Sequence, residues 1–175
     1  NPGDVIDHRT TFIHELSHLL GLGHLGDYNG GSQTESDLVF DNDSRGYSLM
    51  SYVAPNEYET GRFHFNGKPW TYREVDLVAL DVHYGRELSM EERATQWGFD
   101  GTVSHDFINE NFDIVEQNHA AAGSYAPALT IIDTGGKDTL NLRSSLIDLA
   151  VRLDLTPGSY SDILTGKDNL FIHSS

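Results

Sequence analysis

Residues 10–31 read TTFIHELSHLLGLGHLGDYNGG, a stretch in which Glu15 stands directly after the first of three histidines. Apolar residues recur here at helical spacing, which predicts a helix from about residue 7 to residue 20. Residues four apart on a helix lie on one face, so His14 and His18 can direct their imidazoles at one point. The stretch therefore predicts a metal site that begins on a helix.

The third histidine follows the glycines that end this helix. Gly21 and Gly23 stop the helical pattern, and Gly21 permits the positive φ angle of a sharp turn that returns His24 to the same point. Zinc accepts three imidazole nitrogens in a tetrahedral site and keeps its fourth position for water. Glu15 flanks the metal without binding it, where a general base for that water belongs.

The complete pattern, HExxHxxGxxH, is far more specific than its HExxH core. Chance supplies its five fixed positions in on the order of one in ten thousand chains of this size. The pattern is the signature of the metzincin metalloproteases, in which a methionine turn lies beneath the metal. Residues 45–52, RGYSLMSY, place Met50 at a suitable distance. A loop methionine alone indicates core packing, but after this motif it supports the same class.

More narrowly, the sequence resembles the serralysins, the secreted metalloproteases of bacteria. HELSHLLGLGHLGDYNGG is similar to their zinc segment, DSRGYSLMSY to their methionine turn, and VDLVALDVHYG to the helix that follows. The resemblance extends along the chain and is densest before Gly85. It implies a secreted, extracellular zinc endopeptidase that acts on protein or peptide substrates.

The resemblance also implies a role for Tyr52, two residues after the methionine. In the family the matching tyrosine is a fifth, labile zinc ligand, which swings away when substrate binds and helps to stabilise the oxyanion. The residues alone show only a phenol close enough to the turn to reach the metal, and a surface tyrosine is the default interpretation. Leu25 stands where the family usually has proline, which affects loop stiffness and no ligand.

Calcium is one interpretation of DTGGKDT, residues 133–139. Ca²⁺ takes several oxygen ligands, including backbone carbonyls that glycines let converge. A Gly-Gly turn between two strands explains the same residues at least as well. The resemblance implies Ca²⁺ binding by Asp133, Gly135 and Asp138 together with a segment after the second helix. There this chain has EERAT, residues 91–95, without the family's aspartate, so calcium is expected to be weaker, rearranged or absent.

The rest of the chain predicts an α+β fold. Thr71 and Glu74 indicate a capping box for a second helix, with Trp70 and Val75 as its hydrophobic staple. Gly85 ends this helix. Its apolar residues form one stripe: Val75, Val78, Ala79 and Val82. The irregular stretch of residues 25–69 is long enough to be functional.

Strands are expected from residue 128 onward, separated by glycine-containing turns. ALTII is a compact apolar run, and IDLAVRLDL alternates with period two. One face of that second strand carries its apolar residues: Ile147, Leu149, Val151, Leu153 and Leu155. The segment of residues 91–126 fits neither pattern.

By the resemblance, residues 1–88 are the zinc-binding, C-terminal half of a metzincin catalytic domain, its lower subdomain. Residues 89–175 are a β-rich junction leading towards a calcium-binding β-roll, whose GGxGxD repeats are not present. The upper sheet of the family's cleft has no counterpart here. We therefore expect either that this N-terminal half accompanies the chain as a separate polypeptide or that the chain is a partial product, with an apolar face exposed.

The remaining candidate ligands are interpreted as structural. Asp37, Asp41 and Asp43 alternate with apolar residues before the methionine turn, and we expect a solvated loop face. Five further histidines have no partner at ligand spacing: His64, His83, His105, His119 and His173.

Composition narrows the function classes. The net charge of −16 disfavours nucleic acid and anionic membranes as partners and suits cations. Absence of cysteine excludes disulfides, thiolate catalysis and cysteine metal sites. The sequence has no long apolar run and opens without a signal peptide.

Two alternatives to the protease remain open. One is a non-catalytic secreted module or inactive fragment that keeps zinc and calcium as structural staples. The intact motif disfavours it, because a purely structural site needs neither Glu15 nor an open fourth position. The other is a different metzincin branch with a different substrate.

Overall fold

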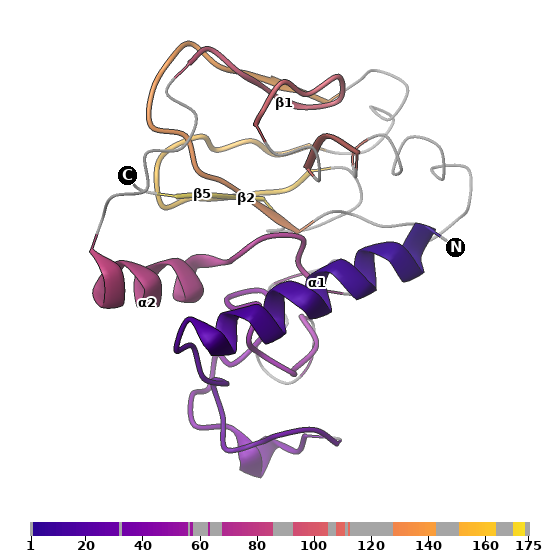
Figure 1. Ribbon diagram of the computed structural model, residues 1–175, viewed down its shortest axis with the longest axis vertical. Helices are drawn as coiled ribbons and strands as arrows, with labels where there is room; N and C mark the ends of the chain where they lie inside the picture. Colours follow the sequence, from indigo (N-terminus) through magenta and orange to yellow (C-terminus); the bar gives the residue numbers. More distant parts are fainter. Residues whose placement is uncertain are drawn as a thin grey trace.

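The structure is a computed structural model of the chain. It describes residues 2–31, 33–55, 57, 63, 68–85, 93–104, 108–110, 112, 128–142, 151–163 and 170–173, with the side chains of residues 2–7 left out. Its helices come from the first half and its short strands from the second, as the α+β prediction requires. In Figure 1 the strands gather at one end and the short 3₁₀ helix η1 (Glu35–Asp37) lies at the other, with α1 and α2 between them.

The active-site stretch forms helix α1 (Pro2–Leu19), which begins earlier than expected. Gly21, with φ of 86°, turns the chain after it as predicted. The helix buries a mainly polar face made by Thr10, His14 and Ser17. Among the side chains that are described, Phe12, Leu16 and Leu19 point outward instead, with Phe12 68% and Leu19 83% exposed. The first helix thus turns its polar side chains towards the interior of the protein and leaves apolar side chains exposed.

Helix α2 (Glu74–Tyr84) ends at the expected Gly85 but begins differently. The predicted capping box is wrong: Arg73 is the N-cap, and its backbone N–H donates to the Asp76 carboxylate at 2.9 Å. The Thr71 hydroxyl is not free to cap because it accepts a hydrogen bond from the backbone N–H of Thr130 at 2.7 Å.

The predicted staple of α2 does not form a buried pair, and its apolar stripe is largely exposed. Trp70 is buried in the core below the strands, whereas Val75 is 37% exposed. Val78 and Val82 are exposed, and the apolar residue that α2 buries is Leu77. Local signals located this helix, whereas the face that the described chain covers depends on distant segments.

The strands form two small sheets. β1 (Gln96–Gly98) pairs in parallel with β3 (Thr139–Asn141). In the second sheet β5 (Leu170–Ile172) lies between β2 (Leu129–Ile131), parallel to it, and β4 (Tyr160–Ser161), antiparallel to it. The ALTII prediction is confirmed by β2, and the DTGGKD turn leads from β2 towards β3.

The predicted alternating strand is wrong in the part that the structure describes. Ile147 and Leu149 lie outside the described residues. Val151, Leu153 and Leu155 are exposed, and only an isolated bridge from Arg152 to Asp162 forms there. In this described part, the alternating apolar residues are therefore not buried against a sheet.

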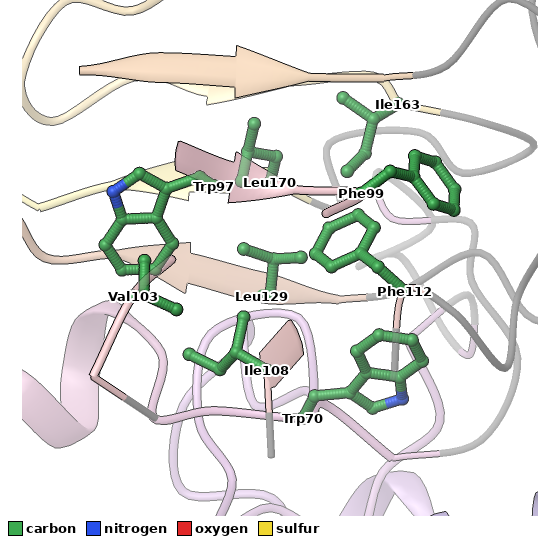
Figure 2. Close-up of a cluster of buried hydrophobic side chains, with 9 residues drawn as sticks. All are labelled: Trp70, Trp97, Phe99, Val103, Ile108, Phe112, Leu129, Ile163 and Leu170. Carbon is green, nitrogen blue, oxygen red and sulfur yellow. The ribbon is translucent and has the colours of Figure 1, made fainter. Parts of the chain in front are cut away.

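The main core joins the approach to α2 to both sheets. Figure 2 shows its nine buried side chains, which are contributed by segments far apart in sequence. Phe112 makes edge contacts with Phe99 and Trp70, at ring-centroid separations of 5.4 Å and 6.1 Å. Arg73, fully buried, adds hydrogen bonds to the carbonyls of Gly46 and Leu129, both at 2.9 Å. The start of α2 is thereby fixed between the methionine turn and the sheet.

Candidate metal centre

The structure brings His14 and His18 of α1 together with His24 from the loop after it. Their ring centroids lie 4.7–5.2 Å apart, and each offers a nitrogen within 4.8 Å of the others. Within the part of the chain that the structure describes, this is the one group of three or more potential metal-ligating side chains found.

Each imidazole is oriented by a hydrogen bond to a backbone carbonyl. Nδ1 of His14 lies 3.0 Å from the oxygen of Leu49. Nδ1 of His18 and Nδ1 of His24 each lie 2.8 Å from theirs, those of Leu22 and Tyr28. A carbonyl can only accept, so each ring carries its proton on Nδ1 and leaves Nε2 with a lone pair. Such partners characteristically fix the tautomer of metal-binding histidines.

The resulting donor set fits a tetrahedral metal ion. Nε2 of His14 and Nε2 of His24 are 3.2 Å apart, and neither has a proton to donate to the other. Two nitrogens bound to one tetrahedral zinc at roughly 2.0–2.1 Å lie about 3.3–3.4 Å from each other. Burial also lowers the pKa of His14, which favours the neutral imidazole that a metal requires.

Glu15 borders an open pocket beside this centre. The pocket has a volume of about 240 Å³, and His14 and Tyr52 line it together with Glu15. Two cationic side chains, those of Arg45 and Lys68, belong to the same lining. Glu15 itself is exposed.

Tyr52 lies close to the histidines, and Met50 is the chain neighbour of a residue that contacts one of them. The Tyr52 ring is half-buried, with its centroid 4.5 Å from that of His24 and 5.6 Å from that of His14. Met50 is 1% exposed, and it directly follows Leu49, whose carbonyl orients His14.

Sequence reasoning missed Tyr28 and misjudged Asp43. Asp43 does not belong to a solvated loop face: it is fully buried and accepts hydrogen bonds from Tyr28 and Ser51. Asp41 is exposed, and Asp37 accepts a bond from the backbone of Thr34. The spacing of the three aspartates does not show which one is buried, because Asp43 contacts Tyr28, which lies fifteen residues earlier in the chain.

The candidate calcium residues gather around Thr95. Its hydroxyl donates to Asp133 at 3.2 Å and to Asp138 at 3.1 Å, while the backbone N–H of Gly135 donates to Asp133 at 3.2 Å. A Cβ on Gly136 would meet the Arg93 carbonyl at 2.6 Å, so the turn packs directly on that segment. Residues 133–138 and residues 93–95, which belong to the two segments that the resemblance assigns to one calcium site, therefore lie next to each other. Glu91 and Glu92 lie outside the described residues.

Of the histidines interpreted as structural, the structure describes two. His173 is buried, with Nε2 3.9 Å from a carboxylate oxygen of Asp81, and His83 is exposed. His64, His105 and His119 lie outside the described residues.

Comparison with known proteins gives consistent relatives. No family model matches the chain. Serralysin C of Dickeya chrysanthemi is 33% identical over 177 aligned positions, which cover 98% of this chain and 33% of that protein. Serralysin of Proteus mirabilis is 33% identical over 161 positions, covering 89% and 29%. Metallopeptidase AprA of Pseudomonas marginalis is 31% identical over 161 positions, covering 89% and 31%.

The relatives and the histidine cluster support a metalloprotease. Within that class the chain is similar to the serralysins along most of its own length, as its motifs predict. It spans about a third of the length of these curated relatives. Among the described residues, no helix combines the length and apolar character that a bilayer crossing requires.

Proposed function

We propose that the protein is a zinc-dependent endopeptidase that hydrolyses peptide bonds in protein substrates. The observation that carries the proposal is the convergence of three imidazoles, each held with Nε2 inward, beside a pocket that Glu15 lines. The names of the relatives, serralysin and metallopeptidase, support the same reaction.

His14, His18 and His24 would hold the zinc ion. When bound, zinc would act as a Lewis acid that lowers the pKa of the attacking water and polarises the carbonyl of the peptide bond. Glu15 accepts the proton of the attacking water and passes it to the leaving amine. Tyr52 borders the same pocket and donates a hydrogen bond from its phenol to the carbonyl oxygen as negative charge develops there. Met50 supports the floor beneath the histidines.

The organisation of the parent protein belongs to the same proposal. Residues 1–88 serve as the zinc-binding half of the catalytic domain and residues 89–175 as the junction to a β-roll. The protein acts outside the cell, on protein or peptide substrates and without nucleic acid or membrane as partners. The upper half of the cleft comes from an N-terminal half, present as another part of the protein or as a separate polypeptide.

Calcium binding at the junction is a further part of the proposal. Convergence of Asp133 and Asp138 on Thr95, next to the Gly135 turn, supports it. The test is calorimetric titration of the metal-free protein with Ca²⁺. An Asp138→Asn variant should bind Ca²⁺ more weakly, whereas Asp100→Asn, an exposed control, should match the parent. Equal Ca²⁺ affinities for all three proteins would show that Asp138 does not bind Ca²⁺ and would contradict a calcium site here.

The decisive experiment on the reaction is Glu15→Ala in the full-length protein, with zinc content and proteolysis measured on the same preparation. Loss of a general base should lower proteolysis by about 10²–10⁴-fold while one zinc stays bound. Glu35→Ala, a change at an exposed glutamate on η1, is the matched control and should keep both properties. Unchanged proteolysis in Glu15→Ala would overturn Glu15 as the general base, whereas a full-length parent that binds zinc but does not cleave protein would favour the non-catalytic alternative.

A further inference from the structure

Tyr28 contacts both the third histidine and the tyrosine of the pocket. Its backbone carbonyl accepts the Nδ1 proton of His24 at 2.8 Å, and its ring stacks on the His24 ring at 5.6 Å. The same ring stacks on that of Tyr52, with centroids 5.2 Å apart and planes inclined by 28°. Its phenol oxygen also accepts a hydrogen bond from the backbone N–H of Tyr52 at 3.3 Å. One side chain therefore contacts a candidate metal ligand and the candidate oxyanion donor.

Asp43 holds that side chain in place from the buried side. The Tyr28 hydroxyl donates to the Asp43 carboxylate, 2.9 Å from Oδ2 and 3.1 Å from Oδ1. Oδ1 also accepts a 2.6 Å hydrogen bond from the hydroxyl of Ser51, which in turn accepts from the backbone N–H of Val53. The carboxylate thus fixes Tyr28 and the residues on either side of Tyr52. A fully buried carboxylate with these partners costs desolvation, so its hydrogen bonds must be retained for the fold to keep this geometry.

We propose that Tyr28, anchored by Asp43, is a positioning residue that sets where the Tyr52 phenol lies relative to the metal centre. The inference rests on the proposed function, because it assigns Tyr28 a role in the reaction that acts through Tyr52. It does not require Tyr28 to touch substrate or metal. The aromatic stack limits rotation of the Tyr52 ring, and the hydrogen bond to the Tyr52 backbone fixes the point from which that ring extends.

Tyr28→Phe isolates the anchoring. The variant keeps the ring and the carbonyl that orients His24, and loses the hydroxyl contacts with Asp43 and with the Tyr52 backbone. We expect kcat to fall about 10–100-fold, the usual effect of removing a residue that orients a metal ligand or its neighbour, with little change in KM or zinc content. Tyr72→Phe is the matched control, since it also loses a half-buried phenol hydrogen bond, to the Ser17 hydroxyl at 2.9 Å.

The test is a double-mutant cycle in the full-length protein, with Tyr28→Phe and Tyr52→Phe alone and together. If Tyr28 acts through Tyr52, the double variant should have the kcat of Tyr52→Phe alone. Multiplied losses in the double variant would overturn the inference and leave Tyr28 with a merely structural role. Asp43→Asn is the second variant. It should lower kcat as Tyr28→Phe does when Tyr52 is present, and it should cause no further loss of kcat in the Tyr52→Phe protein.

A spectroscopic readout separates this inference from the proposed function. After replacement of zinc by Co²⁺, the visible absorption of the metal should change in Tyr28→Phe towards that of Tyr52→Phe and stay unchanged in Tyr72→Phe. A Tyr28→Phe spectrum identical to that of the parent would overturn the inference even if the enzyme is a protease. Failure of the proposed function appears elsewhere, as unchanged proteolysis in Glu15→Ala or as a full-length parent that binds zinc but does not cleave protein.

Discussion

The carboxylate of Asp76, on α2, accepts a 2.7 Å hydrogen bond from the backbone N–H of Leu49, in the methionine turn. The carbonyl of the same Leu49 lies 3.0 Å from Nδ1 of His14. Asp76 also accepts bonds from the Ser48 hydroxyl at 2.6 Å and from the backbone N–H of Arg73 at 2.9 Å. A buried carboxylate therefore connects the start of α2 to the first histidine through one residue, Leu49.

Replacement of Asp76 by asparagine should weaken both the fold and the metal centre. The amide cannot accept from all three donors, and leaving a buried donor unpaired costs about 1–3 kcal/mol of unfolding free energy. Because Leu49 orients His14, zinc affinity should also fall, by about 10–100-fold. Urea unfolding and zinc competition with a chelator measure the two effects. Asp41→Asn, at an exposed position, should change neither, and an Asp76→Asn variant with the parent's zinc affinity would contradict the link.

Met50 should act through packing and not through its sulfur. Met50→Leu keeps the volume of a side chain that is 1% exposed, so we expect a loss of less than about 1.5 kcal/mol and retained zinc. Met50→Ala leaves a cavity and should cost about 2–5 kcal/mol. Thermal unfolding and zinc content of the two variants provide the measurement. If Met50→Leu lost zinc while remaining folded, a role for the sulfur atom would have to be considered.

Tyr160 should make stability fall at alkaline pH. Burial raises the pKa of its phenol above the usual value near 10, and the phenol donates to Glu74 at 2.9 Å. In the unfolded chain the phenol loses its proton above about pH 10, whereas in the folded protein it stays protonated. Its contribution is therefore complete below pH 10 and is lost as the pH rises towards the folded-state pKa.

The measurement for Tyr160 is unfolding free energy between pH 8 and 11. The parent protein should lose stability above about pH 10 more steeply than Tyr160→Phe, which lacks the titrating group. Parallel curves for the two proteins would show that the buried phenol is not the cause.

The convergence of the three histidines could be predicted from the sequence because it depends on local geometry. Helical spacing fixes His14 and His18 on one face, and Gly21 supplies the turn with φ of 86° that brings His24 back. The mixed fold class and strand β2 could also be predicted from the sequence, since both depend on short runs of residues. These features need no knowledge of distant partners.

The features that failed all depend on long-range contacts. Thr71 has the residue type of a helix cap, but its hydroxyl is engaged by Thr130. Asp43 and Asp41 have the same side chain, and only Asp43 meets Tyr28 and Ser51 in the interior. Which helix face is covered also depends on distant segments, and the described part of the chain covers neither Leu19 nor Val82.

The measurement that tests the central claim most directly is X-ray absorption at the zinc edge of the purified full-length protein, with zinc stoichiometry determined in parallel. The account predicts one zinc with three imidazole nitrogens at roughly 2.0–2.1 Å and at least one light-atom ligand besides. His24→Ala should lose one imidazole from that shell. Absence of bound zinc, or a parent shell without three imidazoles, would contradict the assignment of His14, His18 and His24 as the metal centre.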